Sequence, residues 1–278
     1  MKRKCLNALL LILSLSLLLT LCWFGNAFFG NPLSRFLASV TARTHLAATY
    51  PGTDFYVDRI VYDFKSTGYH AYIKSPSSVD THFPLNISML GKLEHDTYDI
   101  CVLNGTNTAS RLRDEYRALT NPVFQDPTFP YDCFISYSGL EIHSDEAFRD
   151  RYIWNTPIPS YAINQKELVV DKLYDISELG KQIGHLYIYI DSDVVTIERA
   201  AEIMLDIKAQ FDRTNVPFKA MDFTLQYPRP DRGLRPEGSV TVSQFLYEDI
   251  YADGLTVRVD RAHKKATAYY ERMDALGK

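Results

Sequence analysis

The sequence predicts an α+β fold, in which an N-terminal transmembrane helix precedes two small domains, each a two-layer arrangement of helices on an antiparallel sheet. Three observations carry this prediction. Residues 5–24 form a run without a formal charge. Beyond it, stretches of aromatic and β-branched residues alternate with segments of helical periodicity. Hydrophobic residues make up 46% and charged residues 23% of the 278 residues, which is enough apolar material for a core.

The N-terminal run, CLNALLLILSLSLLLTLCWF, has the length that a helix needs to cross about 30 Å of hydrocarbon. Three basic residues at 2–4 precede it and the next charge is Arg35, which predicts a cytoplasmic N-terminus and an extracytoplasmic body. We therefore expect a single-pass protein of the cell membrane that meets the lipid bilayer through residues 5–24. Three fates of this segment stay open: an uncleaved anchor, a signal peptide cut after residues 25–27, and a lipoprotein at Cys22.

A first domain is expected over residues 31–156, after a basic stub and anchor at residues 1–30. Asn31-Pro32 is typical of a helix start, and Pro51-Gly52 of its end. The expected buried stripe of this helix consists of Leu33, Phe36, Leu37, Val40 and Ala47.

Strands follow this helix. Residues 55–64 and 69–74 flank a short turn that contains glycine, which predicts a β-hairpin with Tyr69, Ala71 and Ile73 on one face. A third strand is expected over residues 81–88. We then expect a helix near residues 107–120, a proline-rich loop at 122–130, and one or two strands between residues 132 and 143.

The closely spaced prolines of residues 155–160 predict a linker, so the second domain is expected over residues 157–278. HLYIYI and MDFTLQY alternate in polarity and predict strands at residues 185–190 and 221–227. Helical periodicity from Ile197 to Phe211 and from Leu255 to Leu276 predicts two helices, with a strand near Val240 and Val242 before the last one. This order is typical of a two-layer α+β sandwich.

A polar loop is the first candidate site. Ser77, Ser78, Asp80 and His82 lie within one short segment, and these residue types also build hydrolytic and metal sites. A catalytic triad needs a defined hydrogen-bonded order, usually from distant segments. Pro76 with serines and an aspartate is also typical of a turn. We prefer the turn interpretation, and binding before catalysis if the loop is a site.

Two cysteines of the body allow two interpretations. Cys101 and Cys133 form either a single disulfide or two buried thiols, and pairing cannot be read from the sequence. Cys101 stands between Ile100 and Val102, which favours a buried and inert strand thiol.

Metal and cofactor motifs are weak. The seven histidines are scattered without HxH or HExxH spacing. Asp191-Ser192-Asp193 is similar to a DxD metal pair, but it precedes an expected helix, where such side chains cap free N–H groups. We therefore expect no cofactor, no metal ligand and no catalytic residue.

The charge balance argues against nucleic acid as a partner. Three of the 30 basic residues stand at positions 2–4, which leaves 27 basic against 34 acidic residues, a charge of −7, for the rest of the chain. A body of that sign has no excess of cations to neutralise phosphates.

Several motifs resemble the YfjL-like proteins of Firmicutes. They are FGNPLS at residues 29–34, VYDFKSTGYHAYIKSPSSVDTHF at residues 61–83, and the final helix with YYERMD at residues 269–274. The resemblance covers nearly the whole chain, and the SPSSVDTHF part is its most specific stretch. It implies a membrane-anchored two-domain protein of a Gram-positive bacterium, and it implies no activity and no catalytic residues.

Together these patterns predict a binding or interaction protein whose partner is another membrane protein, a secreted protein or a cell-wall polymer. One alternative is an extracytoplasmic hydrolase that uses the Ser77–His82 loop, and another is a structural spacer or assembly subunit without a ligand. A deep pocket at His82 would favour the hydrolase. A tyrosine-lined patch would favour binding, and the chain has 19 tyrosines, although strand propensity alone also accounts for them.

Overall fold

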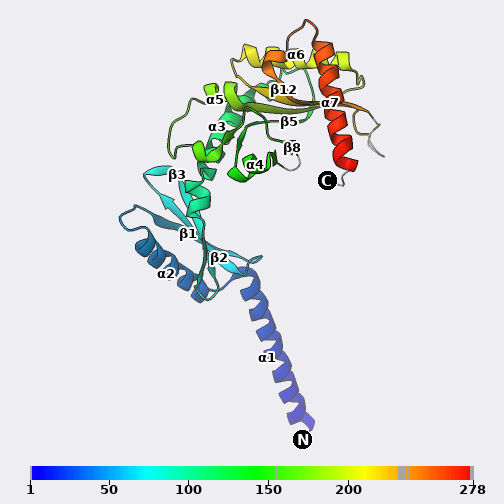
Figure 1. Cartoon of the computed structure of the whole chain (residues 1–278). Helices are drawn as coiled ribbons and strands as arrows, with labels where there is room; N and C mark the ends of the chain where they lie inside the picture. Colours follow the sequence, from blue (N-terminus) through cyan, green and yellow to red (C-terminus); the bar gives the residue numbers. More distant parts are fainter. Residues whose placement is uncertain (1, 154–155, 231–235, 237, 276–278) are drawn as a thin grey trace. The chain divides into compact units, whose positions relative to one another are not determined.

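The computed structural model describes residues 2–153, 156–230, 236 and 238–275 (Figure 1). The chain divides into two compact units, Met1–Asn107 and Thr108–Lys278. This division differs from the expected boundary at residues 156 and 157. The reason is non-local: strand β5 (Cys133–Leu140) pairs with β10 (Gly184–Asp191), so residues before the proline-rich segment belong to the sheet of the second unit.

The first element is a helix, α1 (Lys2–Phe29). A helix that crosses a bilayer must present about 20 predominantly apolar residues to about 30 Å of hydrocarbon. Among the helices of the described residues, none is both long enough and apolar enough for such a crossing. The predicted transmembrane helix at residues 5–24 is therefore corrected. The predicted location of the body, which depended on that crossing, stays a prediction.

The N-terminal unit places helix α2 (Pro32–Thr49) on an antiparallel sheet of order β1-β2-β3-β4, the N-terminal sheet. Its strands are β1 (Tyr56–Asp63), β2 (Gly68–Ser75), β3 (Ser78–Ser88) and β4 (Leu93–Asp96), followed by a π-helical turn, η1 (Asp99–Leu103). The predicted helix start is confirmed, because the Asn31 side chain accepts a hydrogen bond from the Ser34 N–H at 2.8 Å. The predicted hairpin is confirmed as β1 and β2.

The buried face of α2 differs from the expected stripe. Small residues dominate it: Ser34, Ala38, Ala42 and Leu46 are buried. Leu33, Phe36 and Val40 are instead exposed, by 68%, 64% and 46%. The sequence argument selected the larger apolar residues, whereas the small residues Ala38 and Ala42 face the sheet. Tyr69, Ala71 and Ile73 of β2, predicted to share one face, are all buried.

The C-terminal unit is built on a sheet of order β12-β11-β10-β5, the C-terminal sheet. Strands β10 and β11 (Ala220–Gln226) are parallel, and the other neighbours are antiparallel. The sheet is therefore mixed, and the predicted antiparallel sheet is wrong for this unit. Helix α6 (Ile197–Arg213) is the crossover between the two parallel strands, which such a connection requires.

One face of the C-terminal sheet forms the main core. Alternate residues of β10 and β11 point into it and pack with α6 and with the first half of α7 (Leu255–Ala275): Leu186, Ile188, Ile190, Met221, Phe223 and Leu225. Edge strand β12 (Ser239–Leu246) adds Val240 and Val242. Figure 1 shows α7 alongside the sheet, and the backbone of Thr241 on β12 meets the ring of His263 on α7 at 3.2 Å.

A smaller core surrounds helix α3 (Thr106–Phe124), which is longer than predicted and contains Pro122. Its Tyr116 is fully buried and donates a hydrogen bond to the Pro217 carbonyl at 2.9 Å. A Cβ on Gly184 would lie 2.4 Å from the Tyr116 hydroxyl oxygen, so this packing requires glycine at that position.

Short elements complete the unit and connect the larger ones. They are β6 (Ile142–His143), α4 (Asp145–Asp150), β7 (Tyr152–Ile153), β8 (Thr156–Pro157), β9 (Ile163–Asn164), η2 (Gln165–Glu167), α5 (Ile176–Ile183) and η3 (Tyr247–Asp249).

Candidate functional site

The predicted polar loop is divided between two elements: Ser77 lies in the turn between β2 and β3, and Ser78, Asp80 and His82 lie on β3. Ser78 Oγ donates to Thr81 Oγ1 at 2.6 Å and accepts from the Thr81 N–H at 2.9 Å. Ser77 donates its N–H to Asp54, and hydrogen bonds from Ser77 and Ser75 hold the pKa of the Asp54 carboxyl below its usual value. The serines therefore satisfy local backbone and side-chain groups, as turn residues do.

Asp80 and His82 do not complete a catalytic group with these serines. Asp80 is buried, and the Asn107 amide donates to the carbonyls of Asp80 and His82 at 2.8 and 2.6 Å. The His82 side chain is exposed, and in the described part of the chain no hydrogen bond joins it to Ser77 or Ser78. A nucleophile needs an oriented base within hydrogen-bond reach, and this loop places none there.

The cysteines are free thiols, so the disulfide alternative is not realised. Cys101 lies on the π-helical turn η1 rather than on the expected strand. Burial and the charge of Asp132 raise the pKa of the Cys133 thiol to about 11, which keeps it protonated at neutral pH.

The DxD segment makes local contacts. Within the described residues no cluster of three or more histidine, cysteine or acidic side chains has the geometry of a metal site. Asp191 accepts from the Gln226 amide at 3.0 Å, and Ser192 bonds to Val194. The residue that caps α6 is Thr196, so the expected capping role falls outside the DxD segment.

A charged network instead occupies the second face of the C-terminal sheet, the face opposite α6. His185 on β10 is 1% exposed and lies between two carboxylates. Its Nδ1 is 3.1 Å from Glu141 Oε1, and its Nε2 is 3.0 Å from Asp222 Oδ1 on β11. Tyr187 donates to Glu141 at 2.7 Å, and the Tyr161 hydroxyl lies 2.9 Å from His185 Nδ1.

The carboxylates charge the buried imidazole. Burial alone would lower the pKa of His185, but hydrogen bonds and charges from Asp222 and Glu141 raise it to about 9. Burial alone would raise the pKa of Glu141, but hydrogen bonds from His143, His185 and Tyr187 hold it well below its usual value. His185 is therefore an imidazolium at neutral pH, and it is hydrogen-bonded on both ring nitrogens.

Asp222 extends this network to an irregularity in β12. Met221 pairs with Phe245 and Phe223 with Val242, so Ser243 and Gln244 together oppose Asp222 as a β-bulge. Gln244 has a φ of +52°, in the left-handed region that favours glycine. The Gln244 N–H donates to Asp222 Oδ1 at 2.6 Å, and its side-chain amide donates to the Pro157 carbonyl at 2.8 Å.

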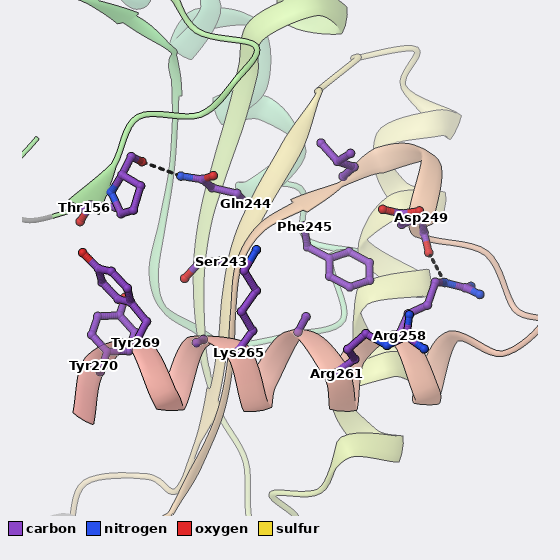
Figure 2. Close-up of a pocket in the computed structure, with 14 residues that line it drawn as sticks. Thr156, Ser243, Gln244, Phe245, Asp249, Arg258, Arg261, Lys265, Tyr269 and Tyr270 are labelled. Carbon is purple, nitrogen blue, oxygen red and sulfur yellow. Dashed lines mark hydrogen bonds between the residues drawn. The ribbon is translucent and has the colours of Figure 1, made fainter. Parts of the chain in front are cut away.

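The bulge forms one wall of a groove between β12 and α7, the α7–β12 groove (Figure 2). Its volume is about 480 Å³. Thr156 and Pro157 of β8, Ser243 to Leu246 of β12 and the inward side of α7 line it. Figure 2 shows Tyr269 and Tyr270 at one end, Asp249 and Arg258 at the other, and Lys265 and Arg261 between them.

The cations of the groove differ in their contacts. Arg258 donates to the carbonyls of Asp249, Tyr251 and Asp253 and lies 3.6 Å from the centre of the Tyr251 ring, so it stabilises the start of α7. Arg261 and Lys265 are exposed and form no salt bridge within the residues that the structure describes. These two cations remain available to a ligand.

Stacked aromatic rings lie on the second face of the sheet, on β10 and β5. His185, Tyr187 and Tyr137 stack in a row, with ring centroids 4.4 and 4.6 Å apart and nearly parallel planes. Tyr137 and Tyr270 are about half exposed. Stacked and partly exposed tyrosines present apolar faces with polar edges, which suits a binding surface.

Sequence reasoning missed this site for identifiable reasons. The alternation of residues 185–190 places His185 and Tyr187 opposite the core-facing Leu186 and Ile188, a signal that was available. Glu141 is distant from His185 in the sequence, and the bulge at Gln244 depends on the register of β11 and β12. No local sequence pattern therefore predicts either feature.

Comparisons with known proteins identify two matching family models. Residues 2–97 match "YfjL-like, N-terminal domain", and residues 115–260 match "YfjL-like C-terminal domain". No curated protein matches the chain. A crystal structure of a DUF5037 family protein from Ruminococcus gnavus ATCC 29149 is 14% identical, with a TM-score of 0.19, and the alignment covers 68% of this chain and 74% of that chain.

Proposed function

The chain belongs to the YfjL-like family, and from this premise we propose that it is a binding protein that acts without covalent chemistry and holds its ligand in the α7–β12 groove. One observation carries this proposal. Gln244 adopts a strained backbone at the wall of the groove, and the buried Glu141–His185–Asp222 network fixes it there. Strain of this kind costs of order 1–3 kcal/mol and clusters at ligand sites.

The contents of the groove favour binding over catalysis. Its lining combines apolar and aromatic side chains, which a ligand can contact, with polar and charged groups that can orient it. Ser243 and Lys265 both line it, but no hydrogen bond joins them in the described structure, so Ser243 has no base to activate it. The hydrolase alternative loses support for the same reason at Ser77 and Ser78, and the tyrosine-lined second face argues against a spacer without a ligand.

A displayed library of random peptides tests the proposal. The purified full chain is panned beside two variants on α7: Tyr270→Ala inside the groove and Val257→Ala, an exposed residue outside it. Loss of one aromatic contact costs about 1 kcal/mol, so we expect selected peptides to bind Tyr270→Ala about fivefold more weakly and Val257→Ala unchanged. Peptides that bind both variants as well as wild type would exclude the groove as the site.

The N-terminal unit supports a second candidate function, docking on a lipid surface. The described large apolar side chains of α1 are exposed, and so are three on α2; they are Leu10, Leu11, Ile12, Leu13, Leu15, Leu17, Leu18, Leu21, Trp23, Phe24, Phe28, Phe29, Leu33, Phe36 and Val40. Apolar surface of this extent marks an interaction site. Arg35 and Arg43 on the exposed side of α2 favour anionic headgroups, so we propose anionic lipid as the partner.

Vesicle flotation tests this second proposal. We expect the full chain to float with anionic vesicles. Replacing Leu13 and Leu17 together by glutamate should reduce the floating fraction by at least half, because the charges must then be desolvated. The matched control is Val79→Glu, which changes an exposed apolar residue of β3. An equal effect of the control, or flotation unaffected by the double variant, would rule out lipid docking through α1.

A further inference from the structure

We infer that the ligand of the α7–β12 groove is an acidic, extended peptide segment; this inference rests on the proposed function and names its ligand class. Charge is the first argument. Three cations and one carboxylate line the groove, whereas the whole chain carries a net charge of −4. Arg258 is bonded to carbonyls of its own chain, so Arg261 and Lys265 are the groups that select an anion.

The apolar part of the groove distinguishes a peptide from a polyanion. Phe245, Leu246 and Ala266 line the groove between β12 and α7, and Tyr269 and Tyr270 close one end. A polyphosphate chain has no apolar group to bury against these side chains. A peptide that alternates carboxylates with apolar residues places both kinds of group within reach of matching partners.

The chain itself shows how an extended backbone is held at this site. Thr156 and Pro157 form the short strand β8 at the edge of the groove, and the Gln244 amide donates to the Pro157 carbonyl at 2.8 Å. The bulge turns Gln244 out of the regular ladder and makes this contact possible. The Gln244 amide thus holds an extended segment of the chain itself at the wall of the groove, and Arg261 and Lys265 are the cations that can bind the carboxylates of a ligand.

Fluorescence anisotropy with the purified full chain tests the ligand class with three probes. The first is a labelled peptide of about 12 residues in which glutamate alternates with serine and leucine. The second is the same peptide with lysine in place of glutamate, and the third is inorganic polyphosphate of similar length. We expect the acidic peptide to bind most tightly, and more weakly as salt rises, because both cations are exposed.

Variants of α7 locate the binding. Arg261→Glu combined with Lys265→Glu should weaken the acidic peptide at least tenfold. The control, Lys264→Glu, reverses one charge at the neighbouring residue, which pairs with Asp260 outside the groove. We expect a change of less than twofold there, because that pair is exposed.

Each other outcome overturns the inference. Equal binding of the lysine peptide would remove charge selection. Polyphosphate that binds as tightly as the acidic peptide, with the same dependence on Arg261 and Lys265, would replace the peptide by a polyanion. If the wild-type chain does not bind the acidic peptide at millimolar concentration, the proposed ligand class is wrong. The groove remains the proposed binding site if library peptides bind Tyr270→Ala more weakly than wild type. If they bind both equally, the proposal of the groove as the binding site is also wrong.

Discussion

At the scale of single residues, His185 makes the stability of the C-terminal unit depend on pH. Its imidazolium lies between Glu141 and Asp222 with almost no access to water. Because its pKa rises to about 9 in the folded chain from about 6.5 when unfolded, it stabilises the fold fully below pH 6.5. That contribution is lost as the pH rises toward 9. Glu141, whose pKa is lowered, contributes above its unfolded pKa of about 4.5, and this is lost in acid.

We therefore expect the melting temperature of the C-terminal unit to fall between pH 6.5 and 9 in the wild-type chain. His185→Gln should melt lower at pH 6, by several degrees, because it leaves two carboxylates without their cation. The difference between the two chains should shrink as the pH approaches 9. Thermal unfolding followed by circular dichroism across this pH range measures both melting temperatures. A difference in melting temperature that does not change with pH would contradict the titration of His185.

Phe223 tests the other face of the same sheet. Its ring is fully buried in the main core among Met221 and Leu225. Phe223→Asp places an unpaired carboxylate there at a cost of several kcal/mol, a large share of a typical stability of about 5–15 kcal/mol. We expect the C-terminal unit to unfold at room temperature. Phe134→Asp, an exposed residue on β5 of the same sheet, is the control and should remain folded.

At the scale of elements, features set by nearby residues were predicted correctly, whereas features set by packing against other elements were predicted wrongly. The Asn31-Pro32 helix start is a local signal, because capping uses atoms within three residues. The buried side of α2 depends on what lies beneath it, and small residues there allow the helix to approach the sheet closely. Hydrophobicity alone therefore selected the wrong stripe. The antiparallel expectation for the C-terminal sheet failed likewise, since strand direction follows from the α6 crossover.

The corrected face of α2 makes a testable prediction. Ala42→Leu adds three carbons where the helix has no exposed surface, and overpacking of this kind costs about 1–3 kcal/mol. Val40→Ser changes an exposed residue and should alter the free energy of unfolding by less than about 0.5 kcal/mol. Urea unfolding of the two variants measures both values. A larger loss of unfolding free energy in Val40→Ser than in Ala42→Leu would show that α2 buries the face expected from the sequence.

The turn between β2 and β3 is the second element with a prediction. Ser78→Ala removes the acceptor of the Thr81 N–H and should reduce the free energy of unfolding of the N-terminal unit by about 1 kcal/mol. His82→Ala, at an exposed position, should be nearly neutral. Activity measured against esters and peptides should be the same in both variants and wild type. A folded variant that loses a measurable activity a hundredfold would return this loop to the candidate sites.

At the scale of the whole molecule, the two-domain prediction was correct in number, and its boundary was displaced by a long-range pairing. Pro157 and Pro159 resemble a linker locally, but the first of them lies on β8 and its carbonyl binds Gln244. Pro157 and Gln244 both line the candidate groove. Apart from Thr156, its lining residues fall within the expected second domain, so the sequence missed the groove because the bulge that positions Gln244 depends on the register of β11 and β12.

Fragments of the chain distinguish the two boundaries. Residues 108–278 keep all four strands of the C-terminal sheet and nearly all of α3, so we expect this fragment to unfold cooperatively. Residues 157–278 lack β5, which leaves one side of β10 without its ladder and takes Glu141 from His185. Unpaired ladder groups on β10 and the loss of one of the two carboxylate partners of His185 each cost on the order of kcal/mol, so we expect this shorter fragment to lack a cooperative transition in denaturant. A fragment 157–278 that unfolds as cooperatively, and at the same midpoint, as 108–278 would show that β5 is not an integral strand of the unit.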